Sequence, residues 1–102
     1  MTALNRHQTR QAAFQSLFGL VLNPTADVDA TITQDLVGDP EIAWEDDIPA
    51  DLKSVVLGVV AHQDELDLMI TDHLSAGWTL ERLNTTDLVL MRLALYEAKF
   101  TG

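Results

Sequence analysis

The stretch from Gly77 to Phe100, GWTLERLNTTDLVLMRLALYEAKF, is the most informative part of the sequence for the fold. Trp78 opens a short helical turn over residues 80–83, and Thr79 is a suitable N-cap for that turn. Residues 84–87, Asn-Thr-Thr-Asp, break the turn and supply a second cap. A strongly apolar helix is predicted to follow. A first set of residues forms its apolar stripe, and a second set widens that stripe. The first set is Leu88, Met91 and Leu95, and the second is Leu90, Leu93 and Ala94.

Helical spacing of apolar residues also runs through the N-terminal part of the chain. A helix is predicted from about Ala3 to Leu22, and Asn23-Pro24 ends it because a residue before proline disfavours helix. A second helix is predicted over Thr25–Val37, which Gly38-Asp39-Pro40 terminates. The apolar stripes are Leu4, Phe14, Leu17, Phe18 and Val21 in the first helix, and Val28, Ile32 and Leu36 in the second.

A long central helix is predicted from about Ala50 to Ser75. Pro49 suits its first position, and Ala76-Gly77 closes it because glycine tolerates the left-handed conformation at helix ends. Gly58 allows close approach of a neighbouring element. The expected buried residues are Leu52, Val55, Val56, Val59, Leu66, Ile70 and Leu74.

No part of the sequence keeps the alternation of apolar and polar residues that a strand requires. An acidic loop over residues 38–49, with Ile42 and Trp44 as anchors onto the core, joins the helices. The 102 residues suffice for one small domain. The predicted fold is therefore all-α, a compact helical bundle of about five helices in a single domain over residues 1–102.

Composition excludes several classes of protein. The chain has no cysteine, which excludes a disulfide framework and thiolate chemistry. No apolar run approaches the length of a membrane span, and the N-terminus lacks the apolar core of a signal peptide. A cytoplasmic location without membrane contact is the expectation.

The charge is unevenly distributed along the chain. Residues 1–26 contain Arg6 and Arg10 and no acidic residue, whereas residues 27–102 hold four basic and all sixteen acidic residues, a net charge of −12. A nucleic-acid binder needs a basic footprint. Any RNA is therefore expected at the first helix, although an ordinary acidic soluble protein has the same overall balance.

Arg6 and Arg10 lie one turn apart and share a face of the first predicted helix, which His7 and Gln11 extend. This spacing lets two guanidinium groups engage successive phosphates while the imidazole and amide form hydrogen bonds. Two arginines on an exposed amphipathic helix are also commonly just solvated. The spacing alone leaves both interpretations open.

Enzymatic chemistry finds no support in the sequence. No G-x-S-x-G motif and no glycine-rich phosphate loop is present. A loose set of possible metal ligands lacks the His pair at i, i+4 or the E-x-x-H pattern that a helical metal site uses, and a solvated helix face is expected there. No cofactor is predicted. The set is His62, Glu65, Asp67, Asp72 and His73.

Three blocks of the sequence together resemble the NusB family of transcription antitermination factors. The first is the W-x-L-x-R-L and T-D-x-x-L-M-R-L-A-L-Y-E pattern over residues 78–97. The second is the arginine-containing turn and A-x-Q-x-L-F stripe of residues 6–18, and the third is the L-G-V-V and L-D-L-M pair of residues 57–69. The resemblance implies a non-enzymatic factor that binds boxA RNA together with the ribosomal protein NusE. It further implies that this pair makes RNA polymerase resist termination, notably in ribosomal RNA operons.

The resemblance also implies roles for individual residues. Arg6 and Arg10 fall on the family's arginine-rich RNA-binding turn, where His7 and Gln8 replace arginines. Phe18 takes the position of an aromatic residue that can stack on a base, and packing in the core is the alternative. Glu81 and Asp87 are expected on the surface that meets NusE, although Asp87 also suits the helix N-terminus. Arg92, Tyr96 and Glu97 are expected to have structural roles.

The chain is expected to be C-terminally truncated relative to the family, because two further helices follow the Y-E block in that pattern. The apolar face of residues 88–95 would then be uncovered, so self-association is a further expectation. Two other functions remain open. One is the N-terminal RNA-binding module of an RNA cytosine methyltransferase, and the other is a helical dimerisation module without RNA binding.

Overall fold

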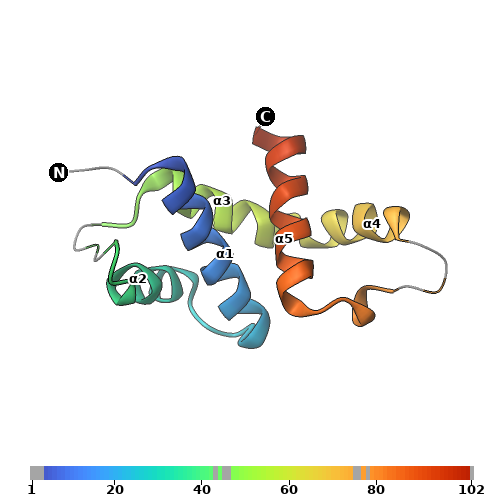
Figure 1. The fold of residues 1–102 in the computed structure, drawn as a ribbon, viewed down its shortest axis with the longest axis horizontal. Coiled ribbons are helices and arrows are strands. Elements are labelled where there is room, and N and C mark those ends of the chain that lie inside the picture. Colours follow the sequence, from blue (N-terminus) through green and yellow to red (C-terminus); the bar gives the residue numbers. More distant parts are fainter. Residues whose placement is uncertain (1–3, 43, 45–46, 75–76, 78, 102) are drawn as a thin grey trace. The chain divides into compact units, whose positions relative to one another are not determined.

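The computed structural model describes residues 4–42, 44, 47–74, 77 and 79–101, and every regular element in this part of the chain is a helix (Figure 1). The predicted all-α fold class is confirmed, with five α-helices among the described residues. The chain separates into two compact units, Met1–Leu57 and Gly58–Gly102, and helix α3 runs from the first into the second. None of the described helices is long and apolar enough to cross a membrane.

Capping side chains set the starts of the first two helices. Helix α1 spans Arg6–Leu22, because the Asn5 side chain accepts a hydrogen bond from the Gln8 backbone N–H at 2.7 Å while the Gln8 side chain accepts one from Asn5 N–H at 3.0 Å. Helix α2 spans Val28–Gly38 and is capped by Asp27. Both helices begin three residues later than predicted, since the capping residues adopt extended backbone; Ala3 itself lies outside the described residues.

Helices α1 and α2 pack together through small residues, which corrects the predicted apolar stripe of α1. Of that stripe only Leu17 is fully buried, and the other four residues are half-buried. The stripe omitted Ala12, Ala13 and Ser16, which are buried. On α2, Ile32 and Leu36 are buried as predicted.

A polar contact fixes the α1–α2 pair. The Ser16 hydroxyl, which is fully buried, donates a hydrogen bond to the Asp35 carboxylate at 3.0 Å. Burial raises the pKa of Asp35, and the hydrogen bond from Ser16 partly offsets that effect. Because the folded pKa is raised, the contribution of Asp35 to stability decreases as the pH rises through that pKa.

The first turns of α3, which spans Ala50–Ala61, complete the first unit. Leu52 and Val56 are buried as predicted. The Lys53 ammonium forms an ion pair with Asp29 of α2 at 3.0 Å. Ile42 and Trp44 in the preceding loop are half-buried, in agreement with the anchoring that the sequence suggested.

The prediction of one helix over residues 50–75 is wrong, because the helix breaks at His62 into α3 and α4, which spans Gln63–His73. His62 has φ −104° and ψ 14°. Its ring Nδ1 and its backbone N–H both lie within hydrogen-bonding distance of the Gly58 carbonyl, at 2.9 and 3.0 Å. This side-chain bond competes with regular helix geometry, and no proline marks the break. Val59, Leu66 and Ile70 are buried as predicted, whereas Val55 and Leu74 are half-buried.

Helix α5, which spans Thr85–Tyr96, packs on α4 with a different face from the predicted one. Arg92 is only 8% exposed and forms two hydrogen bonds to the Asp67 carboxylate, at 2.8 and 2.9 Å. Turning Arg92 inward places Leu90 and Met91 on the surface, 49% and 38% exposed. The buried residues of α5 are Val89, Arg92, Leu93 and Tyr96, of which Leu93 was predicted, while Leu88 and Leu95 are half-buried.

Two short elements flank α5. The predicted turn before it is the 3₁₀ turn η1, Leu80–Arg82, whose N-cap is Thr79, whereas Trp78 lies outside the described residues. The π-helical turn η2, Glu97–Thr101, follows α5. There Lys99 donates to Glu65 at 2.9 Å, which lowers the pKa of Glu65, and the Phe100 ring packs on His62 with centroids 4.3 Å apart.

We predict that Gly58→Ala destabilises the protein. A Cβ at this position would overlap the ring of Tyr96, which is itself nearly buried. Overpacking of this kind typically costs about 1–3 kcal/mol, more than the roughly 1 kcal/mol that Gly→Ala gains in helix propensity. Chemical denaturation followed by circular dichroism measures the change.

Gly38→Ala is the matched control for that experiment. Gly38 is also a helical glycine, but an added Cβ there meets no atom within 4 Å. We expect this control to leave stability unchanged or to raise it slightly. Equal stability of the Gly58→Ala and Gly38→Ala variants would contradict the close packing of Tyr96 on Gly58.

Candidate functional site

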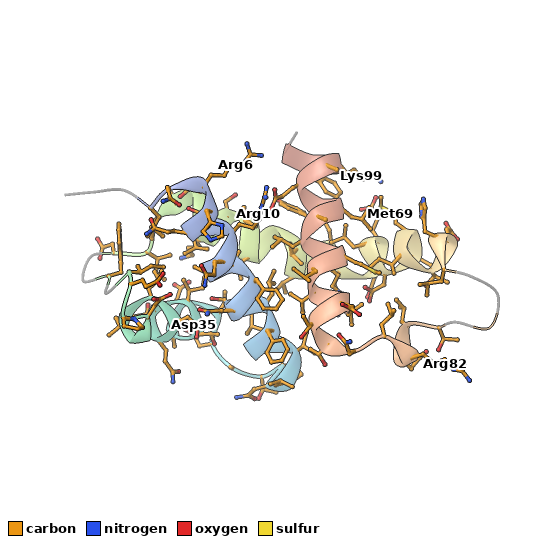
Figure 2. The ribbon with its side chains drawn as sticks, viewed as in Figure 1. Arg6, Arg10, Asp35, Met69, Arg82 and Lys99 are labelled. Carbon is orange, nitrogen blue, oxygen red and sulfur yellow. The ribbon has the colours of Figure 1, made fainter. Side chains whose placement is uncertain are left out.

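The exposed edge of α1 brings together four of the five residues predicted to bind RNA. Arg6, His7, Arg10 and Gln11 are all exposed within the first two turns of the helix. Figure 2 shows the two arginines one turn apart on α1. Arg10 also takes part in an interaction within the chain, so a ligand at this edge would compete for it.

The capping box gives the first turn of this edge a defined geometry. Asn5 and Gln8 exchange two hydrogen bonds around the helix start, and Arg6 and His7 lie between them in the sequence. Gln8 therefore has a local structural role at a position where the resemblance suggested arginine. The Gln8 side-chain carbonyl is already used by the cap. The cationic side chains of this edge are therefore the two arginines, Arg6 and Arg10.

Phe18, the fifth predicted residue, is half-buried two turns further along α1. Its ring centroid lies 6.0 Å from that of Phe14, with the ring planes tilted by 41°. The Phe18 ring thus packs against Phe14 and is also partly exposed. Phe14 was not among the predicted site residues, although its i, i+4 spacing to Phe18 was the available signal.

The two residues predicted to contact a protein partner lie on the second unit. Glu81 is exposed in η1, and its pKa is lowered because its carboxylate accepts hydrogen bonds from its own backbone N–H and from the Thr79 side chain. Asp87 is exposed in the first turn of α5, where its backbone N–H donates to the capping Asn84 side chain at 2.8 Å. A carboxylate at that position is stabilised by the helix dipole.

The second unit is acidic at its surface because its cations are largely used internally. It contains seven acidic and three basic residues. Arg92 is paired with Asp67, and Lys99 with Glu65. Arg82 on η1 is exposed (Figure 2). Such a surface favours a basic partner over a phosphate backbone.

Four of the five residues considered as loose metal ligands have other partners. His62 packs among aromatic rings, Asp67 binds Arg92 and Glu65 binds Lys99. His73 lies 2.8 Å through Nδ1 from the Met69 carbonyl. No group of three or more possible ligands within metal-binding reach occurs in the described part of the chain.

Comparison with known proteins gives consistent matches. The sequence profile of the NusB family matches residues 7–102. A protein of Levilactobacillus brevis named transcription antitermination protein NusB is 49% identical over 94 residues, which cover 92% of this chain and 65% of the relative. Proteins with the same name from Lacticaseibacillus paracasei and Lactiplantibacillus plantarum are each 45% identical, over 94% and 96% of this chain and 67% and 69% of theirs.

The chain spans about two thirds of the length of these relatives. No solved structure gives a significant match. The matched region includes the α1 edge as well as η1 and α5, so both groups of predicted site residues fall inside it.

We predict that Thr79→Val raises the pKa of Glu81 towards its ordinary value. The substitution removes the hydroxyl that donates to the carboxylate, while the hydrogen bond from the Glu81 backbone remains, so the rise is partial. Titration of the side-chain carboxyl carbon by NMR measures it. Thr86→Val, an exposed threonine on α5, is the control and should leave Glu81 unchanged. An unaltered Glu81 titration in the Thr79 variant would contradict this geometry.

Proposed function

The chain belongs to the NusB family, and from this we propose that it is a transcription antitermination factor that binds boxA RNA together with the ribosomal protein NusE. The observation that supports this most strongly is the match to relatives named for antitermination over more than nine tenths of the chain. Those names favour antitermination over an RNA methyltransferase module. The proposed role is non-enzymatic and takes place in the cytoplasm, on RNA polymerase that transcribes long structured operons such as those for ribosomal RNA.

The proposed RNA-binding surface is the edge of α1 formed by Arg6, His7, Arg10, Gln11 and Phe18. Four of these side chains are exposed, and residues 1–26 contain no acidic residue that would repel a phosphate backbone. Guanidinium groups form charge-assisted hydrogen bonds to phosphate, and the amide and imidazole add neutral ones. With two cations, this surface is expected to bind RNA weakly when it acts alone.

The proposed surface for NusE includes Glu81 and Asp87. Both carboxylates are exposed, and hydrogen bonds to the Glu81 carboxylate lower its pKa. A basic ribosomal protein is attracted to such a surface. In this mechanism NusE supplies a second RNA-binding surface, and the two weak contacts to RNA add when the proteins are joined. The joined pair then acts on RNA polymerase.

A helical dimerisation module is the second candidate, and the exposed side of α5 is the observation in its favour. Leu90 and Met91 on one turn and Ala94 on the next are exposed, while Arg92, which lies between them in the sequence, is buried and paired with Asp67. An uncovered apolar stripe of this kind promotes association. Self-association through α5 is compatible with the antitermination role, because the proposed RNA edge lies on α1.

We expect the double substitution Arg6→Ala and Arg10→Ala to weaken binding of boxA RNA by about 1–3 kcal/mol, the scale of hydrogen bonds to charged groups. Binding of NusE should be unchanged. Fluorescence anisotropy of labelled RNA and calorimetry with NusE measure the two affinities. Arg82→Ala, which removes an exposed cation from the second unit, is the control and should retain RNA binding. Equal loss of RNA and NusE binding in the double variant would refute two separate surfaces.

We expect the average mass of the protein in solution to rise with concentration in multi-angle light scattering. Leu90→Gln combined with Met91→Gln should reduce this rise, because the two side chains dominate the exposed apolar stripe of α5. Leu68→Gln is the control, since Leu68 is 68% exposed but lies on α4. A monomeric mass at every concentration would exclude self-association.

A further inference from the structure

Four residues of α1 follow one another at intervals of one turn. Arg6, Arg10, Phe14 and Phe18 are spaced i, i+4, i+8 and i+12 and so form a single row along the helix. With a rise of about 1.5 Å per residue, the row is roughly 18 Å long. It places two cationic side chains in the N-terminal half of α1 and two aromatic rings in the C-terminal half.

A second row of hydrogen-bonding side chains runs beside the first. His7, Gln11 and Gln15 each follow one member of the first row by one residue, and all three are exposed. These side chains offer donors and acceptors next to both the cations and the rings. Since the first acidic residue of the sequence is Asp27, no carboxylate side chain of α1 lies along either row.

The two rings lie on the side of α1 away from α2. Ser16 marks the side that α2 covers, because it is fully buried and bonded to Asp35 of that helix. At about 100° per residue, Phe14 and Phe18 each lie roughly 160° around the helix from Ser16. The rings are half-buried, with centroids 6.0 Å apart and planes tilted by 41°. Part of each ring is therefore accessible to a ligand.

The order of these side chains fits single-stranded nucleic acid. Guanidinium groups contact phosphates, and aromatic rings stack on unpaired bases. One strand that lies along the row would bind the two arginines through its phosphates and the two rings through its bases. Duplex RNA would not, because its base faces are hidden inside the stack. The polar second row provides hydrogen-bonding groups beside the stacked bases.

We propose that Phe14 and Phe18 form a stacking platform for the bases of single-stranded RNA, continuous with the phosphate contacts of Arg6 and Arg10. Phe14 is the additional RNA-binding residue, and the strand runs along α1 and not across it. The inference rests on the RNA-binding function proposed above and adds to it a direction and a base contact.

The first test measures anisotropy of fluorescein-labelled single-stranded boxA RNA with the full chain, alone and with NusE. Phe14→Leu should weaken binding by about 5- to 150-fold, the range for loss of one stacked base, and Phe14→Tyr should retain wild-type affinity. Phe100→Leu, which changes a phenylalanine of the second unit, is the matched control. Circular dichroism establishes that each variant is folded.

The salt dependence of these affinities separates stacking from electrostatics. Removing the two arginines lowers the slope of affinity against salt concentration, because fewer counterions are released on binding. Phe14→Leu should reduce affinity while leaving that slope unchanged. A merely structural defect would weaken the arginine contacts as well and would change the slope.

The second test uses the wild-type chain and so does not depend on any variant. Single 2-aminopurine substitutions through the RNA report stacking by quenching of their fluorescence. Quenching confined to one or two neighbouring positions on binding supports the platform. Unchanged or increased fluorescence at every position overturns it.

Three further outcomes are also decisive. If Phe14→Leu binds RNA like the wild type while the double arginine variant does not, the platform is wrong and the proposed function stands. If the wild-type chain binds no RNA even with NusE, the proposed function fails and the platform fails with it. Loss of NusE binding but not of RNA binding in Phe14→Leu would assign the rings to a protein contact and refute the platform.

Discussion

A buried ion pair between α4 and α5 determines how the second unit is assembled. Arg92 places a guanidinium in a site that is only 8% exposed, and the Asp67 carboxylate receives two of its hydrogen bonds. An unpaired charge there would be costly, since breaking a buried pair typically destabilises a protein by about 3–5 kcal/mol. This requirement fixes the rotation of α5 about its axis. Val89, Leu93 and Tyr96 then face inward, and Leu90 and Met91 are exposed to solvent.

The same rotation accounts for the packing at the break between α3 and α4. Tyr96 is directed onto Gly58, where an added Cβ would overlap the tyrosine ring. His62 lies one turn after Gly58, bonded through its ring to the Gly58 carbonyl, and Phe100 packs on its imidazole at 4.3 Å. Lys99 reaches Glu65 in the next turn. The helix break is thus stabilised by the last turns of the chain, through aromatic contacts and one exposed ion pair.

The sequence predicted those features that depend on local chemistry. Helices, their approximate ends and a cap within residues 84–87 follow from residue type and spacing, and the structure has that cap at Asn84. Thr79 stands at the predicted N-cap position of η1, but its side chain forms no capping hydrogen bond. The sequence did not predict the break at His62, because no proline or glycine marks that position in the sequence. It also assigned the wrong face of α5 to the core. Apolar periodicity counts Leu90 and Met91 as buried, whereas the pairing of Arg92 with Asp67 on another helix turns both of them to the surface.

In the candidate site, too, the sequence predicted the features that depend on local spacing and missed those that depend on packing between helices. The arginine pair was predictable from a spacing of four residues, and so was the exposed position of its edge. The side of α1 that α2 covers was not predicted, because Ser16, which is fully buried and bonded to Asp35 of α2, was absent from the predicted apolar stripe, as were the buried Ala12 and Ala13. With α2 on that side, Phe14 and Phe18 are left on the other, and the half-buried ring of Phe14 joins an edge to which the sequence had assigned Phe18 as its one aromatic residue. An otherwise acidic protein thereby keeps one acid-free helix edge, where two cations can bind a strand with little competing repulsion from the same helix.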